Sequence, residues 1–216
     1  MIFLRNRSSR REEALPLRSF QPRYLGCHQV FKTPRIRAGL LSCLLVALAT
    51  NAFAHRLDEY LQATRVSVST SRIDLSIDLT PGVAVANQVL AAIDTDRTGH
   101  ISEDEVTAYT KSVLGNIQVG LDGKPLTLRI ESTSFPALHE IKSGLGVIRI
   151  KATASVEPLA SGQHTLSLIN AHLPAISVYL VNALVPKDRS IQITKQTRDE
   201  LQKHYQLEFG ANPATR

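Results

Sequence analysis

The chain has 216 residues, with 25 Lys/Arg, 19 Asp/Glu and a net charge of +6, which alone would admit a nucleic-acid-binding protein. The basic residues are unevenly spread, because residues 1–54 hold 9 Lys/Arg and 2 Asp/Glu, which leaves 16 and 17 for residues 55–216 and a net charge of −1 there. A nearly neutral main part excludes the basic surface with which proteins hold DNA or RNA, so we expect no nucleic-acid partner.

The first quarter of the chain has the pattern of an export signal. An apolar run at residues 40–49 follows three basic residues and precedes Ala-Phe-Ala at 52–54, a small-x-small cleavage pattern. The run is about half of the roughly 20 residues that a membrane-spanning helix needs. A lipoprotein signal at Cys43 is the alternative, but almost no apolar residues precede that cysteine. We predict a leader over 1–54, cleavage before His55, and a periplasmic or secreted protein that does not span the membrane.

The two cysteines, Cys27 and Cys43, both fall in the predicted leader. The rest of the chain therefore offers no disulfide, no cysteine zinc site and no thiol nucleophile. It also lacks the serine elbow, the glycine-rich phosphate loop and the H-E-x-x-H pattern of common enzyme classes. We predict that the protein is not an enzyme.

Strand patterns begin shortly after the predicted cleavage site. Residues 72–79 alternate strictly between polar and apolar, which is typical of a half-buried strand, and residues 63–69 precede them across a short turn. Further along, the segments 117–121 and 126–130 flank an Asp-Gly step at Asp122, which predicts a hairpin.

The second half of the chain continues in the same manner, and residues 176–185 are so apolar that we expect a central strand there. Many short strands separated by turn residues favour a mainly β fold, namely an immunoglobulin-like β-sandwich formed by one domain over 55–216. The further predicted strands are 146–155, 163–169, 176–184, 190–195 and 201–209.

Only the segment 83–114 breaks the strand pattern, with two amphipathic helices predicted at 83–93 and 103–114. Their apolar residues recur at helical spacing. They are Val85, Val89 and Ile93 in the first helix and Val106, Tyr109, Val113 and Leu114 in the second.

Residues 94–105, between these helices, match the twelve-residue calcium loop of an EF-hand, so we predict an inserted helix–loop–helix EF-hand with Ca²⁺ as its cofactor. Gly99 permits the sharp turn and Ile101 is the apolar anchor. Three ligating carboxylates favour a dissociation constant of about 10⁻⁴–10⁻³ M. The alternative is an acidic turn in which Asp94 and Ser102 merely cap the helices. The predicted ligands are Asp94, Asp96, Thr98, His100 through its backbone carbonyl, Ser102 through water, and Glu105.

No second calcium loop is found, so Ile101 must be buried against its own domain or against a second copy of the chain. A calcium sensor opens a methionine-rich groove, and residues 55–216 contain no methionine. We therefore favour a structural clip, in which Ca²⁺ fixes the angle between the two helices.

Cleavage at the predicted site would leave His55 as the first residue. Its α-amine and imidazole together can chelate Cu²⁺ or Ni²⁺. The alternative is that His55 is merely the residue that signal peptidase leaves behind. A second histidine would strengthen such a site, but the spacing of His139, His164, His172 and His204 does not indicate one.

Three features together resemble the extracytoplasmic N-terminal domain of bacterial nickel/cobalt-type transporter proteins. They are the Ala-His start at 54–55, the loop at 94–105 and the hairpin sequence L-D-G-K-P-L-T-L at 121–128. The resemblance covers most of 55–155. In that family the domain precedes a multi-helix permease, which this sequence lacks, so the resemblance implies a free-standing periplasmic domain.

Two functions follow as hypotheses. In the first, the protein is an exported calcium-binding module that binds or interacts with another periplasmic protein. In the second, it is a periplasmic accessory that uses His55 to capture Ni²⁺, Co²⁺ or Cu²⁺ for a separately encoded membrane permease.

Overall fold

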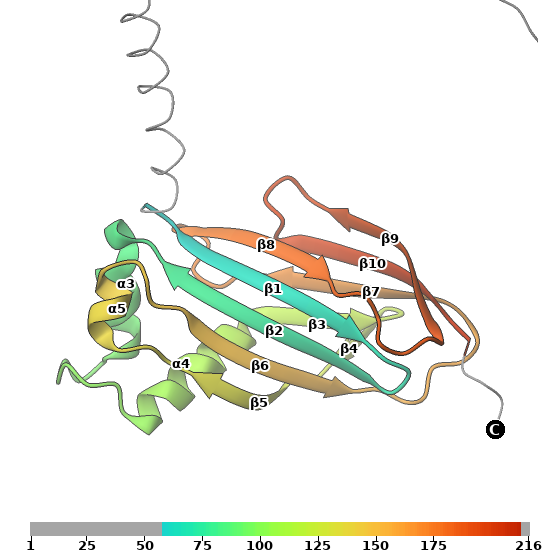
Figure 1. Cartoon of the computed structure of the whole chain (residues 1–216), viewed down its shortest axis with the longest axis horizontal. Coiled ribbons are helices and arrows are strands. Elements are labelled where there is room, and N and C mark those ends of the chain that lie inside the picture. The colour runs from blue at the N-terminus through green and yellow to red at the C-terminus, as the bar shows by residue number, and fades with distance from the viewer. Residues whose placement is uncertain (1–57, 213–216) are drawn as a thin grey trace, which may run out of the picture. The chain divides into compact units, whose positions relative to one another are not determined.

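The computed structural model describes residues 58–212, so the predicted leader, the cleavage site and His55 lie outside the described residues. Within this range the protein is mainly β, with two sheets and three helices (Figure 1). No helix of this range is long and apolar enough to cross a membrane.

The first sheet has the strand order β5-β6-β2-β1-β8, and all its neighbours are antiparallel except β1 and β8. The second sheet has the order β4-β3-β7-β10-β9 and is antiparallel throughout. The strands of the first sheet are β1 Tyr60–Val68, β2 Arg72–Pro81, β5 Arg129–Ser134, β6 Ile148–Ser155 and β8 Ser177–Ala183; those of the second are β3 Ile117–Leu121, β4 Lys124–Leu126, β7 Gly162–Asn170, β9 Ile191–Arg198 and β10 His204–Ala211.

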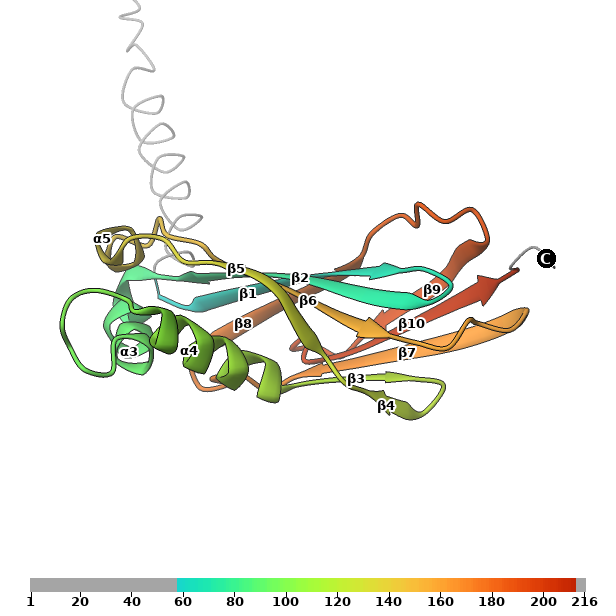
Figure 2. The same ribbon diagram turned by 90° about the horizontal axis from the view of Figure 1, so that it is seen from below.

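The two sheets lie in two layers and contribute to one hydrophobic core (Figure 2). The strict alternation of β2 places Ile73, Leu75 and Ile77 inside, each no more than 1% exposed, because successive side chains of a strand point to opposite faces. From the second sheet, Leu207 and Phe209 of β10 are also fully buried. A core shared by two sheets is the arrangement of a β-sandwich.

Two helices stand between β2 and β3, where the sequence predicts them: α3 Val83–Ile93 and α4 Glu103–Gly115. A third helix, α5 Leu138–Lys142, lies between β5 and β6 and was not predicted. Figure 1 shows α3 and α5 together at the end of the sheets where β2 ends and β6 begins. Ile141 of α5 is fully buried and ties that short helix to the core.

The prediction of a central strand at 176–185 is wrong, because β8 is an edge strand whose only strand neighbour is β1. Its inward residues Tyr179 and Val181 are buried, whereas Leu180 between them is 39% exposed. The outer edge of β8 is met by side chains of β9. The Arg198 guanidinium donates to the carbonyl of Val181 at 2.8 Å. This bond satisfies a backbone carbonyl on the sheet edge that could otherwise pair with a strand of another chain.

The Asp-Gly hairpin is confirmed, but its predicted second arm at 126–130 is divided between the two sheets. Strand β4 ends at Leu126, and Arg129 begins β5, which pairs with β6 in the other sheet. The turn itself needs positive φ at two positions, which Asp122 (50°) and Gly123 (78°) provide.

Candidate metal centre

Helix α3 fixes the start of the loop, because the apolar face of the helix is buried in the core. Val85, Val89 and Ile93 are buried at the predicted spacing. The helix ends at Asp94, whose N–H still donates to the carbonyl of Leu90 at 2.8 Å while its backbone has left helical geometry. The carboxylate of Asp94 therefore starts the loop from a fixed position.

Helix α4 begins at the other end of the loop with a capping box. Ser102 is the N-cap, and its hydroxyl accepts the N–H of Glu105 while the Glu105 carboxylate accepts the N–H of Ser102 at 3.0 Å. Buried Tyr109 and Val113 anchor the helix below. Glu105 is thereby fixed at the start of α4, with a residue exposure of only 8%.

The loop brings three carboxylates together. One carboxylate oxygen from each of Asp94, Asp96 and Glu105 lies within 4.8 Å of the others. Among residues 58–212 this is the only such group of three or more histidine, cysteine, aspartate or glutamate side chains. Such a cluster can hold a metal ion, and its oxygen donors suit a hard divalent cation.

Backbone N–H groups hold these carboxylates in place. Asp94 accepts the N–H of Thr98 at 3.0 Å and of Gly99 at 3.1 Å, and Asp96 also accepts the Thr98 N–H at 3.1 Å. Glu105 accepts the N–H of Thr95 at 2.7 Å. Both ends of the loop are therefore connected through its acidic side chains.

Glu105 remains ionised throughout the neutral range. The N–H of Ser102 is the main cause, acting against partial burial, and with the Ser102 hydroxyl and the N–H groups of Thr95 and Asp96 it lowers the pKa of Glu105 to about 2. Negative charges held this close repel one another unless a cation lies between them, so a divalent ion would relieve an electrostatic cost.

The remaining predicted ligands occupy the same loop. The Thr98 hydroxyl donates to the carbonyl of His100 at 3.2 Å, which brings two predicted oxygen ligands together, and both residues are exposed. The Ser102 hydroxyl donates to Glu105 at 2.9 Å. Gly99 has φ = 80°, as the sharp turn requires, and nothing lies within 4 Å of a Cβ built there.

Capping explains part of this arrangement, because Ser102 caps α4 and Asp94 accepts N–H groups of the loop. Asp96 is placed by local contacts as well, because it accepts the N–H of Thr98 and its own N–H lies 3.5 Å from the Glu105 carboxylate. These contacts bring together three carboxylates that could hold a metal ion.

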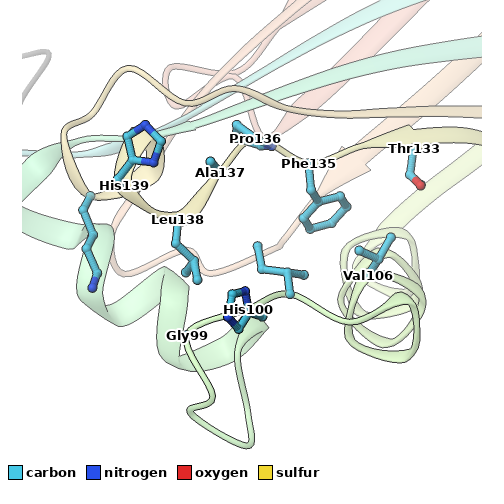
Figure 3. A pocket seen from close by; sticks show the side chains of 11 residues that line it. Gly99, His100, Val106, Thr133, Phe135, Pro136, Ala137, Leu138 and His139 are labelled. Carbon is cyan, nitrogen blue, oxygen red and sulfur yellow. The ribbon is translucent and has the colours of Figure 1, made fainter.

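The anchor residue Ile101 is partly buried against its own domain and packs on the hydrophobic core. It lines a pocket together with Phe135, which lies between β5 and α5, and Leu138, the first residue of α5 (Figure 3). A single loop thus obtains its apolar support within the chain, without a second copy.

The histidines make no further metal cluster among the described residues. His55, with its predicted transition-metal site, lies outside the described residues. His164 bonds Asp122 through Nδ1 at 2.7 Å and the Ala160 carbonyl through Nε2 at 2.9 Å. His139 and His204 are exposed, and His172 is buried.

Sequence reasoning missed a buried polar cluster that connects α4 to the sheets. The hydroxyl groups of Tyr60 and Tyr109 lie 2.7 Å apart, and the Tyr109 hydroxyl lies 3.3 Å from Nε2 of His172. The His172 carbonyl accepts bonds from Gln62 and Tyr179 at 2.8 Å each. Tyr109 is one helical turn from Glu105, so this cluster fixes the helix that carries the last predicted ligand.

Fold and site together define a mainly β protein with a candidate metal centre in a helix–loop–helix. No family model and no curated protein matches the chain.

Proposed function

We propose that the protein is an exported calcium-binding module in which Ca²⁺ acts as a structural clip at the loop of residues 94–105. The observation that carries the proposal is the convergence of Asp94, Asp96 and Glu105 within 4.8 Å. Ca²⁺ takes six to eight oxygen ligands, and three carboxylates, the Thr98 hydroxyl, the His100 carbonyl and water supply donors of this kind.

The mode of action follows from where the loop is attached. Asp94 ends α3 and Glu105 lies in the first turn of α4, and both helices are anchored by buried side chains. An ion bound between the two carboxylates connects the helices directly. Ca²⁺ therefore stabilises that end of the sheets, without a large movement of either helix.

At a finer level we propose that the sheets form an immunoglobulin-like sandwich and that residues 83–114 are an EF-hand inserted between β2 and β3. The two-layer arrangement and the shared core support the first statement, and the capping box and the turn at Gly99 support the second. The proposed location is the periplasm or the extracellular medium, and the proposed partner is another periplasmic protein or a membrane metal permease.

The test is thermal unfolding of the purified protein with and without calcium. With a dissociation constant of about 10⁻⁴–10⁻³ M, 10 mM Ca²⁺ stabilises the native state by roughly 1.4–2.7 kcal/mol. This free energy raises the melting temperature by roughly 3–10 °C in a domain of this size. Glu105→Gln should abolish the increase, because glutamine keeps the capping box but loses the charge.

The matched control is Glu103→Gln, since Glu103 is an exposed residue of the same first turn and lies outside the carboxylate cluster. Glu103→Gln should keep the calcium-dependent increase. An unchanged melting temperature of the wild-type protein at 10 mM Ca²⁺ would count against the proposal, as would an equal loss in both variants.

A further inference from the structure

A surface pocket lies beside the candidate metal centre. It has a volume of about 730 Å³ and is lined on one side by Gly99, His100 and Ile101 of the loop and on the other by residues between Thr133 and Lys142 (Figure 3). This volume is within the range of about 300–1,000 Å³ that small-molecule sites occupy. The proposed calcium site does not use this pocket.

The lining combines an apolar wall with basic side chains. Its large apolar members are all partly buried. No aspartate or glutamate lines the pocket, although the acidic loop is adjacent. The apolar members are Ile101, Val106, Phe135 and Leu138, and the basic members are His100, His139 and Lys142.

Two of the basic side chains, His139 and Lys142, come from α5. Figure 3 shows Leu138 between His139 and His100, with Phe135 and Val106 toward the other side. Lys142 follows His139 by three residues on α5, so the two side chains are neighbours on that helix. The pocket therefore offers N–H donors and a permanent positive charge next to Leu138, with the aromatic ring of Phe135 further along its wall.

The wall formed by α5 is held rigidly. Ile141 is fully buried, and the N–H groups of Leu145 and Gly146 both donate to the carbonyl of Glu140, at 3.0 and 2.8 Å. The Glu140 carboxylate accepts the N–H of Ala137 at 3.0 Å and caps the helix. A preformed wall lowers the ordering cost of binding.

We propose that this pocket binds a small organic anion with an apolar body of about the size of an aromatic ring. The anionic group would lie at the end formed by His139 and Lys142, and the apolar body would lie against Phe135, Leu138 and Ile101. Charge complementarity selects an anion, because every ionisable side chain that lines the pocket is basic.

In one respect the inference rests on the proposed function. The His100 carbonyl is a predicted calcium ligand, and the next residue, Ile101, lines the pocket. An ion that fixes this carbonyl also fixes that wall, so calcium should strengthen anion binding and the anion should strengthen calcium binding by the same factor. Couplings of this kind are typically about fivefold or more.

The experiment is a titration of the ¹⁵N-labelled protein with 4-phenylbutyrate, followed by amide chemical shifts with and without 10 mM Ca²⁺. The comparison compounds are the uncharged 4-phenylbutanamide and acetate, which has the carboxylate without the apolar body. Saturable shifts should centre on residues 99–101 and 133–142 with phenylbutyrate and be weak or absent with both other compounds. Lys142→Gln should weaken binding roughly threefold to tenfold.

The matched control for charge is Lys151→Gln, because Lys151 is an exposed residue of β6 that does not line the pocket. It should bind phenylbutyrate as the wild-type protein does. Equal binding of the amide, or an equal effect of both lysine variants, would overturn the proposed recognition of charge.

The calcium arm separates this inference from the proposed function. If calcium shifts the loop amides and phenylbutyrate produces no saturable shifts, the pocket proposal fails and the calcium proposal stands. If calcium produces no shifts, the calcium proposal and the coupling fail, and the titration without calcium still decides whether the pocket binds the anion.

Discussion

Removing one buried hydroxyl group, in the substitution Tyr109→Phe, should measurably loosen the attachment of α4 to the first sheet. The Tyr109 hydroxyl lies 2.7 Å from that of Tyr60 and 3.3 Å from Nε2 of His172. Tyr60 is fully buried, and within the described residues its hydroxyl bonds only to Tyr109. Burial raises the pKa of Tyr109 to about 12, which keeps its phenol neutral at physiological pH.

The expected size follows from the partner left behind. A buried hydroxyl without a partner costs about 1–3 kcal/mol, so the melting temperature of Tyr109→Phe should fall by roughly 2–12 °C. Tyr60→Phe should cost less, because the Tyr109 hydroxyl keeps Nε2 of His172 as a partner at 3.3 Å. The double variant should lose clearly less than the sum of the two single losses, because it leaves neither tyrosine hydroxyl unpaired.

The assay is urea unfolding of the wild-type protein and the three variants, which together form a double-mutant cycle. A coupling free energy of about 1 kcal/mol or more between Tyr60 and Tyr109 is expected. Additive losses, or a loss below about 0.5 kcal/mol for Tyr109→Phe, would refute the inference that this contact fixes α4.

Three further outcomes are expected. Burial lowers the pKa of His172 to about 4. The free energy of unfolding should therefore be highest above about pH 6.5, the usual imidazole pKa, and should fall by roughly 3 kcal/mol as the pH drops to 4. A free energy of unfolding that does not depend on pH over this range, relative to His172→Gln, would contradict the prediction. The Asp122 carboxylate raises the pKa of His164, so this contact stabilises the folded protein at low pH and the stabilisation is lost as the pH rises through the folded-state pKa. An NMR titration should place the midpoint of His164 above that of His172. Gly123→Ala should cost about 1–2 kcal/mol of stability because the φ of Gly123 is 78°. Gly115→Ala, at the end of α4, should be neutral or stabilise the protein by up to about 1 kcal/mol. A Cβ meets nothing within 4 Å at either position, so equal effects of the two substitutions in urea unfolding would show that φ is not the cause.

Local patterns predicted much of the fold. The strict alternation over residues 72–79 appears as β2, with Ile73, Leu75 and Ile77 in the core. Helix α3 begins and ends as its apolar spacing indicates. The loop residues converge because the contacts that position them are themselves local: Asp94 bonds to residues four and five positions later, and Glu105 bonds to Ser102, three positions earlier.

Features that depend on distant contacts were not predictable in the same way. The apolar sequence of β8 is equally compatible with a central strand and with an edge strand, and its position depends on the register with β1 and on Arg198 of β9. The division of residues 126–130 depends on the pairing of β5 with β6. Helix α5 has only five residues, too few for a periodic pattern, and is held largely by the burial of Ile141.

The buried tyrosine–histidine cluster illustrates the same limit. Tyr60, Tyr109 and His172 are separated by 49 and 63 positions, so no spacing rule connects them. Their polar atoms meet only after the sheets and α4 have formed. His55, on which the transition-metal hypothesis depends, lies outside the described residues and stays a prediction.

The most direct measurement for the central claim is a Ca²⁺ titration of the ¹⁵N-labelled protein that follows the amide of Gly99. This N–H donates to Asp94 at 3.1 Å, so an ion on that carboxylate must change its chemical shift. A saturable shift with a dissociation constant of about 10⁻⁴–10⁻³ M is expected, and it should be lost in Glu105→Gln. A Gly99 amide that does not move up to 10 mM Ca²⁺ would contradict calcium binding at this loop.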